Sequence, residues 1–133
     1  MNSAIVLLVA RILLAIIFIL AGFSKLMDIA GTAAYFGAYN LPAPSALAVA
    51  SGLVELLGGL AILAGFQTRI AGWVMAAFCV ATAVIAHSDW ADFNQMIHFQ
   101  KNLAMAGGFL MLAVHGAGAL SADARRGEVP AHA

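Results

Sequence analysis

The sequence predicts an all-α integral membrane protein: a four-helix bundle with a short interfacial helix between the first and second spans. Hydrophobic residues make up 64% of the 133 residues and charged residues only 9%, against roughly 25% charged residues in soluble domains. A helix needs roughly 20 apolar residues to cross a hydrocarbon core of about 30 Å. Stretches of about this length fill most of the chain: 4–24, 45–65, 70–87 and 101–119.

The pattern of apolar residues in these stretches favours helices over a transmembrane barrel. Backbone groups in lipid must pair within the protein, so only helices or a closed barrel can span a bilayer. Barrel strands alternate apolar and polar residues over about ten positions, whereas residues 12–21 and 103–114 are apolar on every side. At this length we expect one transmembrane domain over 1–133, with a polar C-terminal tail at 120–133.

The first stretch is predicted to be a retained span and not a signal peptide. The residues ahead of it carry no basic side chain, and Arg11 interrupts the apolar run. The next segment, 28–46, contains Tyr35 and Tyr39 followed by Pro42. Tyrosines favour the headgroup level, where the ring is half buried and the hydroxyl is wet. We therefore expect a short interfacial helix and then a proline turn.

The second and third spans are joined by only a few residues, which makes them antiparallel neighbours. Gly65 is placed to end one helix and Thr68 to cap the next. Trp73 and Trp90 lie roughly 26 Å apart along a helix axis, which fits the two interfacial belts of one bilayer. The loop at 87–100 is polar and leads into the last span.

The distribution of basic residues predicts cytoplasmic termini. Four spans place both termini on one side, together with Arg69, and the tail adds Arg125 and Arg126. The other side holds Lys25 and Lys101. Cytoplasmic segments carry an excess of Lys and Arg, so the arginine-rich side is expected to face the cytoplasm.

Small residues recur where helices should touch, and they allow close backbone approach. Tight packing within one chain is the expected use, while a homo-oligomer contact stays open as an alternative. These residues are Ser51, Gly52, Gly58, Gly59, Ala104, Gly107 and Gly108.

Arg11 and Glu55 are predicted to form a polar core. A lone charge in mid-membrane costs at least ~2.5–3.5 kcal/mol. Counted from the cytoplasmic ends of their spans, the two residues differ in depth by only about 4–5 Å, so we expect an ion pair. Such a pair either fixes the first two spans together or belongs to a proton or substrate site.

Lys25, His87 and Lys101 end three of the spans on the presumed outer side. They are expected to gather at a weakly cationic mouth, suited to a quinone carbonyl or a small anion, although lysines at helix ends also snorkel to headgroups. This candidate ligand mouth is the second set of site residues.

Other chemistry finds little support in the sequence. The loop after the third span contains residue types that bind metal ions: His87, Asp89, Asp92 and His98. Loop residues that simply face water show the same pattern, so no metal site is predicted. His87 and His115 lie near opposite faces, which argues against a haem held by both. Cys79 has no second thiol. No hydrolytic motif occurs, so no catalytic residue is assigned. The net charge is zero, whereas nucleic-acid-binding proteins carry clusters of basic residues, so nucleic-acid binding is not predicted.

The motifs together resemble the DoxX family over residues 9–123. They are Arg11, F-I-L-A-G-F-S-K at 18–25, G-L-V-E-L-L-G-G at 52–59, G-F-Q-T-R at 65–69, His87, Q-K-N-L-A at 100–104, and G-x-G-x-x-S-x-D at 116–123.

The resemblance implies a four-helix protein of the bacterial inner membrane, in contact with lipid and associated with membrane oxidoreductase systems. Arg11, Lys25, Glu55, His87 and Lys101 match the family's polar pattern, and no catalytic role follows for any of them. With no intrinsic cofactor sequence, redox work requires a quinone or an oxidoreductase partner subunit. We therefore expect a quinone-interacting or accessory subunit. A small transporter of a metabolite, proton or anion, and a scaffold without a ligand, are the alternatives.

Overall fold

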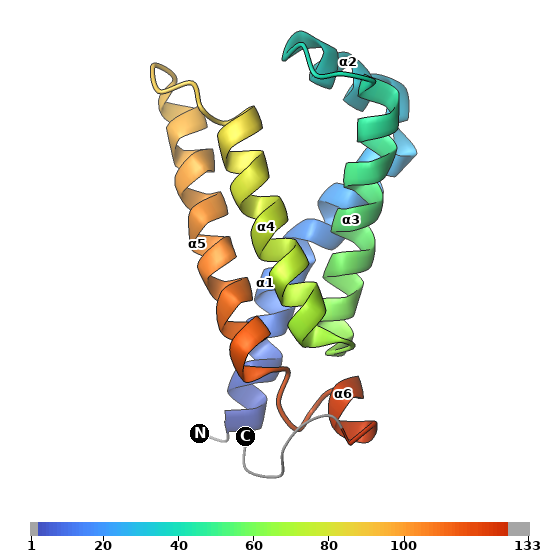
Figure 1. Cartoon of the computed structure of the whole chain (residues 1–133), viewed down its shortest axis with the longest axis vertical. Coiled ribbons are helices and arrows are strands. Elements are labelled where there is room, and N and C mark those ends of the chain that lie inside the picture. The colour runs from blue at the N-terminus through green and yellow to red at the C-terminus, as the bar shows by residue number, and fades with distance from the viewer. Residues whose placement is uncertain (1–2, 128–133) are drawn as a thin grey trace.

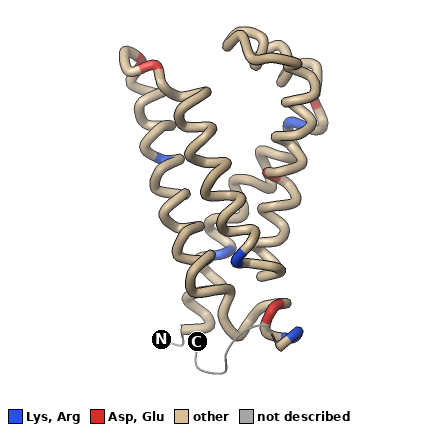
Figure 2. The backbone as a smooth tube through the Cα atoms, viewed as in Figure 1, with Lys and Arg blue, Asp and Glu red and all other residues tan. Residues whose placement is uncertain are grey.

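The computed structural model describes residues 3–127, and every regular element in this part is a helix (Figure 1). The helices are α1 (Ser3–Met27), α2 (Ile29–Ala38), α3 (Pro44–Ala64), α4 (Thr68–Ala86), α5 (Phe93–His115) and α6 (Ala122–Arg125). Each of α1, α3 and α4 is long and apolar enough to cross a membrane. Figure 2 shows how few Lys, Arg, Asp and Glu residues interrupt the long helices. The all-helical membrane class is confirmed at this level.

The boundaries of α5 differ most from the prediction. The last apolar stretch was placed at 101–119, but α5 runs from Phe93 to His115. Its start is fixed by Asp92, whose side chain accepts a hydrogen bond of 2.8 Å from the backbone N–H of Asn94. Its end is fixed by Gly116, which has a φ of +77°. Capping, which hydropathy does not register, therefore sets both ends.

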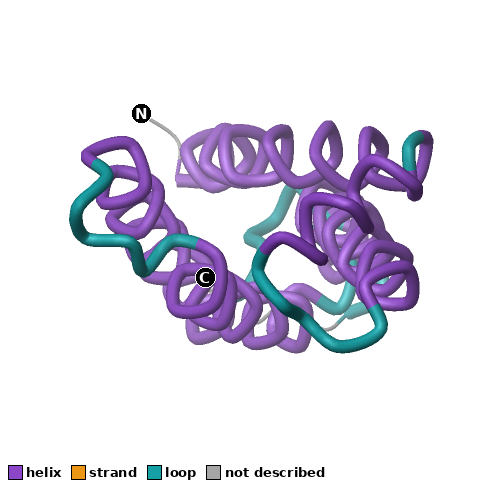
Figure 3. Tube along the Cα trace, turned by 90° about the horizontal axis from the view of Figure 1, so that it is seen from above, coloured by secondary structure: helices purple, strands orange, loops and turns teal. Residues whose placement is uncertain are grey.

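Two helix pairs form the body of the molecule. α1 lies along α3, and α4 lies along α5. In Figure 1 α1 runs obliquely, from beside the C-terminal end of α5 to α2 at the opposite end. Figure 3 shows the same helices from above, joined by short loops, without a strand in residues 3–127. The pairs converge towards α6 and diverge towards α2.

A shared core holds the pairs together in the convergent half. The rings of Phe18 in α1 and Phe109 in α5 meet edge to face, with centroids 5.3 Å apart, a favourable geometry for aromatic pairs. Ile62, Met75 and Cys79 are fully buried around them. This cluster links α1, α3, α4 and α5.

Glycines permit the closest backbone contacts. A Cβ on Gly22 would lie 2.5 Å from the backbone N of Leu56, and one on Gly72 would lie 2.8 Å from the carbonyl oxygen of Phe109. Gly58 and Gly59 are likewise covered by Met75 and Ile19. Gly58 and Gly59 thus serve packing within one chain, as expected, whereas Gly107 has nothing within 4 Å of a Cβ and Ala104 is exposed.

The outward faces of the long helices remain apolar. Leu13 and Leu20 of α1 are 69% and 62% exposed. Exposed apolar surface of this kind marks contact with an apolar partner, and on membrane-length helices that partner is the lipid bilayer.

Candidate functional site

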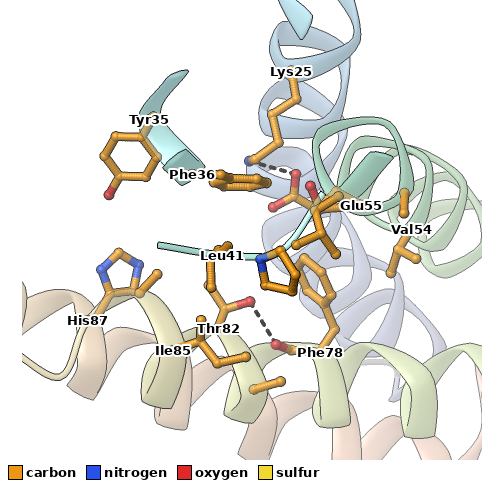
Figure 4. A pocket seen from close by; sticks show the side chains of 16 residues that line it. Lys25, Tyr35, Phe36, Leu41, Val54, Glu55, Phe78, Thr82, Ile85 and His87 are labelled. Atoms are coloured by element: carbon orange, nitrogen blue, oxygen red, sulfur yellow. Dashed lines mark hydrogen bonds and ion pairs between the residues drawn. The ribbon is translucent and has the colours of Figure 1, made fainter. Parts of the chain in front are cut away.

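A pocket of about 690 Å³ lies between the diverging helix pairs, in the half of the molecule that carries α2 (Figure 4). Its volume falls in the range of ligand sites, roughly 300–1,000 Å³. The lining combines apolar side chains with a few polar groups. The lining residues are Lys25, Tyr35, Phe36, Leu41, Pro42, Leu47, Ala50, Ser51, Val54, Glu55, Phe78, Ala81, Thr82, Ile85, Ala86 and His87.

A salt bridge between Lys25 of α1 and Glu55 of α3 forms one wall of the pocket. Nζ of Lys25 donates to Oε2 of Glu55 at 2.7 Å. The Glu55 side chain is only 8% exposed and that of Lys25 is 25% exposed. Gly22, one turn before Lys25, packs against Glu55 and so brings the two helices together at this level. Oε1 of Glu55 accepts no hydrogen bond from residues 3–127, and the residue faces the pocket.

His87 lies on the opposite side of the pocket, at the C-terminal end of α4 (Figure 4). Its Nδ1 is 2.7 Å from Oε1 of Gln95, and its ring stacks on that of His98 with centroids 5.1 Å apart. Since an amide oxygen only accepts hydrogen bonds, Nδ1 carries the proton in this arrangement. Nε2 of His87 has no hydrogen-bond partner in the described residues.

Tyr35 of α2 lines the pocket on the same side as His87 in Figure 4. Its hydroxyl donates to that of Tyr39 at 3.1 Å. Desolvation and this hydrogen bond raise the pKa of Tyr35 to about 12. The phenol is therefore neutral at physiological pH.

A protein-family model matches the part of the chain that forms the pocket. The family model described as DoxX matches residues 6–88, a range that contains every residue lining the pocket. The chain belongs to the DoxX family.

Three relatives of this DoxX protein cover most of its length. "Inner membrane protein YqjF" of Escherichia coli (strain K12) is 46% identical over 87% of this chain and 88% of its own. "Inner membrane protein YphA" of the same organism is 38% identical over 91% and 90%. "Putative oxidoreductase CatD" of Bacillus subtilis (strain 168) is 33% identical over 87% and 83%. No solved structure matches the chain.

The predicted ion pair between Arg11 and Glu55 is wrong in this DoxX protein, because Glu55 pairs with Lys25. Contacts of α1 with α3 set Gly22 beside Glu55 and Arg11 beside Gly65. Arg11 therefore lies beside a point on α3 that is ten residues, or about 15 Å, beyond Glu55. Counting depth from helix ends failed because the two helices are not aligned at their ends. Both residues are nevertheless buried, at 1% and 6% exposure.

Arg11 instead faces the C-terminal segment. Its Nη2 donates to the carbonyl oxygen of Leu120, and the Asp123 charge attracts it. Asp123 also accepts from the backbone N–H groups of Gln67 and Thr68 at 2.7 and 2.9 Å. Asp123 thus caps α4, the role predicted for the Thr68 side chain, whereas Gly65 ends α3 as predicted, with a φ of +66°.

Of the predicted ligand mouth, the structure brings together Lys25 and His87 but not Lys101. Lys101 lies two turns inside α5 on an exposed face, because α5 begins at Phe93. Lys101 does not line the pocket. Nor do any three His, Cys, Asp or Glu side chains among the described residues sit close enough together to hold a metal ion.

Two contributors to these sites escaped prediction. Gln95 was part of a polar loop with no distinguishing signal. Asp123 did have a signal in the sequence, because it is the last residue of the G-x-G-x-x-S-x-D motif. In the structure, Gly116 and Gly118 of this motif adopt positive φ, and Ser121 caps α6. That motif folds the segment back onto the turn between α3 and α4.

Proposed function

We propose that this DoxX protein is a four-span inner-membrane protein that binds a quinone in the pocket and serves as an accessory subunit of a membrane oxidoreductase. The pocket carries the proposal. It is large enough for a quinone ring, it is walled mainly by apolar side chains such as Leu47, Val54 and Phe78, and it presents polar groups on opposite sides. Ligand sites typically combine these features.

The names of the relatives support the membrane location and the redox role in this proposal. Two of them are named inner membrane proteins, and the third is named "Putative oxidoreductase CatD". The chain itself holds no redox cofactor sequence, so electrons would come from a partner subunit and the quinone would carry them.

The membrane arrangement proposed here adds α5 as a fourth span and places α2 at the interface. With 23 residues, α5 is about 35 Å long and exceeds a hydrocarbon core of about 30 Å. α2 has no buried residue and carries Tyr35 and Tyr39, which suit the headgroup level. The positive-inside rule then places α6 and the turn at Arg69 in the cytoplasm.

Native mass spectrometry of the protein released from nanodiscs, with identification of what stays bound, tests the proposal. We expect a stoichiometric quinone. Ala81→Phe should displace it by filling the pocket, whereas Ala104→Phe on the exposed face of α5 should retain it. Phospholipid alone, or a quinone that persists equally in both variants, would contradict the proposal.

A small transporter is the second candidate, and the Lys25–Glu55 salt bridge favours it. Ionisable residues within membrane spans often mark ion or substrate pathways. Proton or anion flux into proteoliposomes that is lost in Glu55→Gln would support transport. Equal flux in the wild type and the variant would count against that role of Glu55.

A further inference from the structure

The wall of the pocket formed by α2 is held less firmly than the walls formed by the long helices. α2 supplies Tyr35 and Phe36 to the lining, and the turn after it supplies Leu41 and Pro42. The helix packs against α3 and, less extensively, against α1, and it has no buried residue. In Figure 1 it extends from the end of α3 towards α4. On this side the pocket is therefore walled by a helix that no core fixes in place.

The hydrogen bonds of α2 stay within the helix and its own ends. Asp28 caps its start through the backbone N–H of Gly31, and the Tyr35 hydroxyl donates to that of Tyr39. The N–H groups that follow the helix bond back to its last turn. A Cβ on Gly37 would meet nothing within 4 Å. Within the described residues, α2 can therefore move as a unit without breaking a hydrogen bond to α3, α4 or α5.

Both ends of α2 have the character of joints. At its start, Asp28 alone separates it from α1. After its end, Asn40 and Ala43 have positive φ values of 54° and 47°. Asparagine tolerates this conformation, but alanine rarely adopts it, and Ala43 precedes Pro44, a position that favours extended backbone. Such strain persists only where surrounding contacts hold it, and it clusters at ligand clamps and switch regions.

The rim that α2 would approach on closing belongs to α4. Ile85 and His87 line the pocket there, and Figure 4 shows Tyr35 on the same side as His87. Ile85 is 52% exposed and Tyr35 is 47% exposed. With a ligand in place, moving α2 towards α4 would add contacts of both side chains with that ligand, and dispersion contacts are weak singly but add up. Over an empty pocket the same movement would gain few contacts, so occupancy favours closure.

We propose that α2 is a hinged lid over the pocket, open in this structure, which closes towards α4 when a ligand fills the space between them. Asp28 and the turn at 39–43 are its hinges. The identity of the ligand rests on the proposed quinone-binding function, whereas the motion does not. With α2 at the membrane interface, the lid controls entry to the pocket from the headgroup level.

Distances between spin labels, measured by pulsed EPR on the full-length protein in nanodiscs, test the motion. Gly37→Cys on α2 and Ser88→Cys after α4 carry the lid pair of labels, in a Cys79→Ala background. Leu57→Cys, on the exposed face of α3, replaces Gly37→Cys in the matched control pair. We expect two populations for the lid pair without ligand, and a decyl-tailed benzoquinone should move most molecules into the population with the shorter distance. The control pair should give one narrow distribution that the probe leaves unchanged.

Ala43→Gly tests the hinge. Glycine adopts positive φ without steric cost, so this variant should stabilise the open position, enlarge the population with the longer distance and weaken binding of the probe severalfold. Ala34→Gly, on the exposed side of α2, is the matched variant. It weakens the helix equally in both positions of the lid, so the two populations should keep their wild-type ratio.

The outcomes separate the lid from the proposed function. One population for the lid pair, unmoved by the probe, would overturn the lid, and so would two populations that a bound probe fails to shift. If the probe binds in those cases, quinone binding stands. Two populations in a protein that does not bind the probe would support the lid and overturn the proposed function alone. The wild-type distributions decide this even if a hinge variant fails to fold.

Discussion

At the scale of single residues, the charges in this protein are placed by helix register. The approach of Gly22 to Glu55 sets Lys25 within hydrogen-bonding distance of that carboxylate, and the same register sends Arg11 to Gly65. Glu55 is thereby paired with Lys25 at the pocket. Arg11 donates from Nη2 to the carbonyl oxygen of Leu120 in the C-terminal segment, while its buried Nε and Nη1 have no hydrogen-bond partner in the described residues.

The Lys25–Glu55 salt bridge predicts coupling between the two residues. Lys25→Met and Glu55→Gln should each lower stability, and the double variant should lose less than the sum, giving a coupling free energy of about 1–3 kcal/mol. Denaturant unfolding in detergent micelles measures it. A cycle on Arg11 and Glu55 is the control and should show coupling near zero. Strong coupling between Arg11 and Glu55 would instead support the ion pair expected from the sequence.

Gly65 should resist substitution for two reasons. It has a φ of +66°, and a Cβ would run into Nη1 of Arg11. The left-handed conformation alone costs an alanine about 1–2 kcal/mol, so Gly65→Ala should destabilise by at least that amount in a thermal unfolding assay. Gly107→Ala is the comparison, since nothing lies within 4 Å of a Cβ there. It should be neutral or slightly stabilising.

At the scale of elements, helix ends are fixed by side chains from elsewhere in the chain as well as by local residues. α5 is capped locally by Asp92, but α4 is capped by Asp123, which lies 55 and 56 residues away from the groups it accepts from. The apolar stretches of α1, α3 and α4 were predictable to within three residues. The cap of α4 was not, because it depends on how the C-terminal segment folds back.

Loss of Asp123 should therefore weaken more than one element. Asp123→Ala removes two hydrogen bonds at the start of α4 and the charge that attracts Arg11, and we expect a loss of about 2–4 kcal/mol. Asp28→Ala serves as the matched variant, because Asp28 caps α2 through one exposed hydrogen bond. It should cost only about 0.5–1 kcal/mol. Similar losses in the two variants would show that Asp123 is no more than an ordinary cap.

At the scale of the whole molecule, two helix pairs joined at one end leave a pocket at the other. The separate polar residues could be found in the sequence, since charges and histidines stand out in apolar spans. Their grouping was only partly predictable. Lys25 and His87 line one pocket from opposite sides, Glu55 pairs with Lys25, and Lys101 lies outside the pocket. These placements depend on helix register and on where α5 begins, which are tertiary properties.

The proposed topology predicts which loops face outward. Single cysteines at Ser88, between α4 and α5, and at Ala119, before α6, should differ in labelling by a membrane-impermeant maleimide. Ser88→Cys should react in intact cells, and Ala119→Cys only after the cells are permeabilised. The native Cys79 is buried and provides a low background. Labelling of both positions from the same side would exclude the four-span arrangement.

The contact between Arg11 and Leu120 has a consequence for biosynthesis. The two residues are 109 positions apart, which corresponds to roughly 5–20 s of translation. During that time α1 must enter the membrane with a guanidinium that has neither its carbonyl partner nor the Asp123 carboxylate nearby. The contacts of the first helix are thus completed only after the segment around Leu120 has been synthesised. A chain cut short before Leu120 would leave Arg11 without these partners, so only chains that extend past this segment can finish the fold.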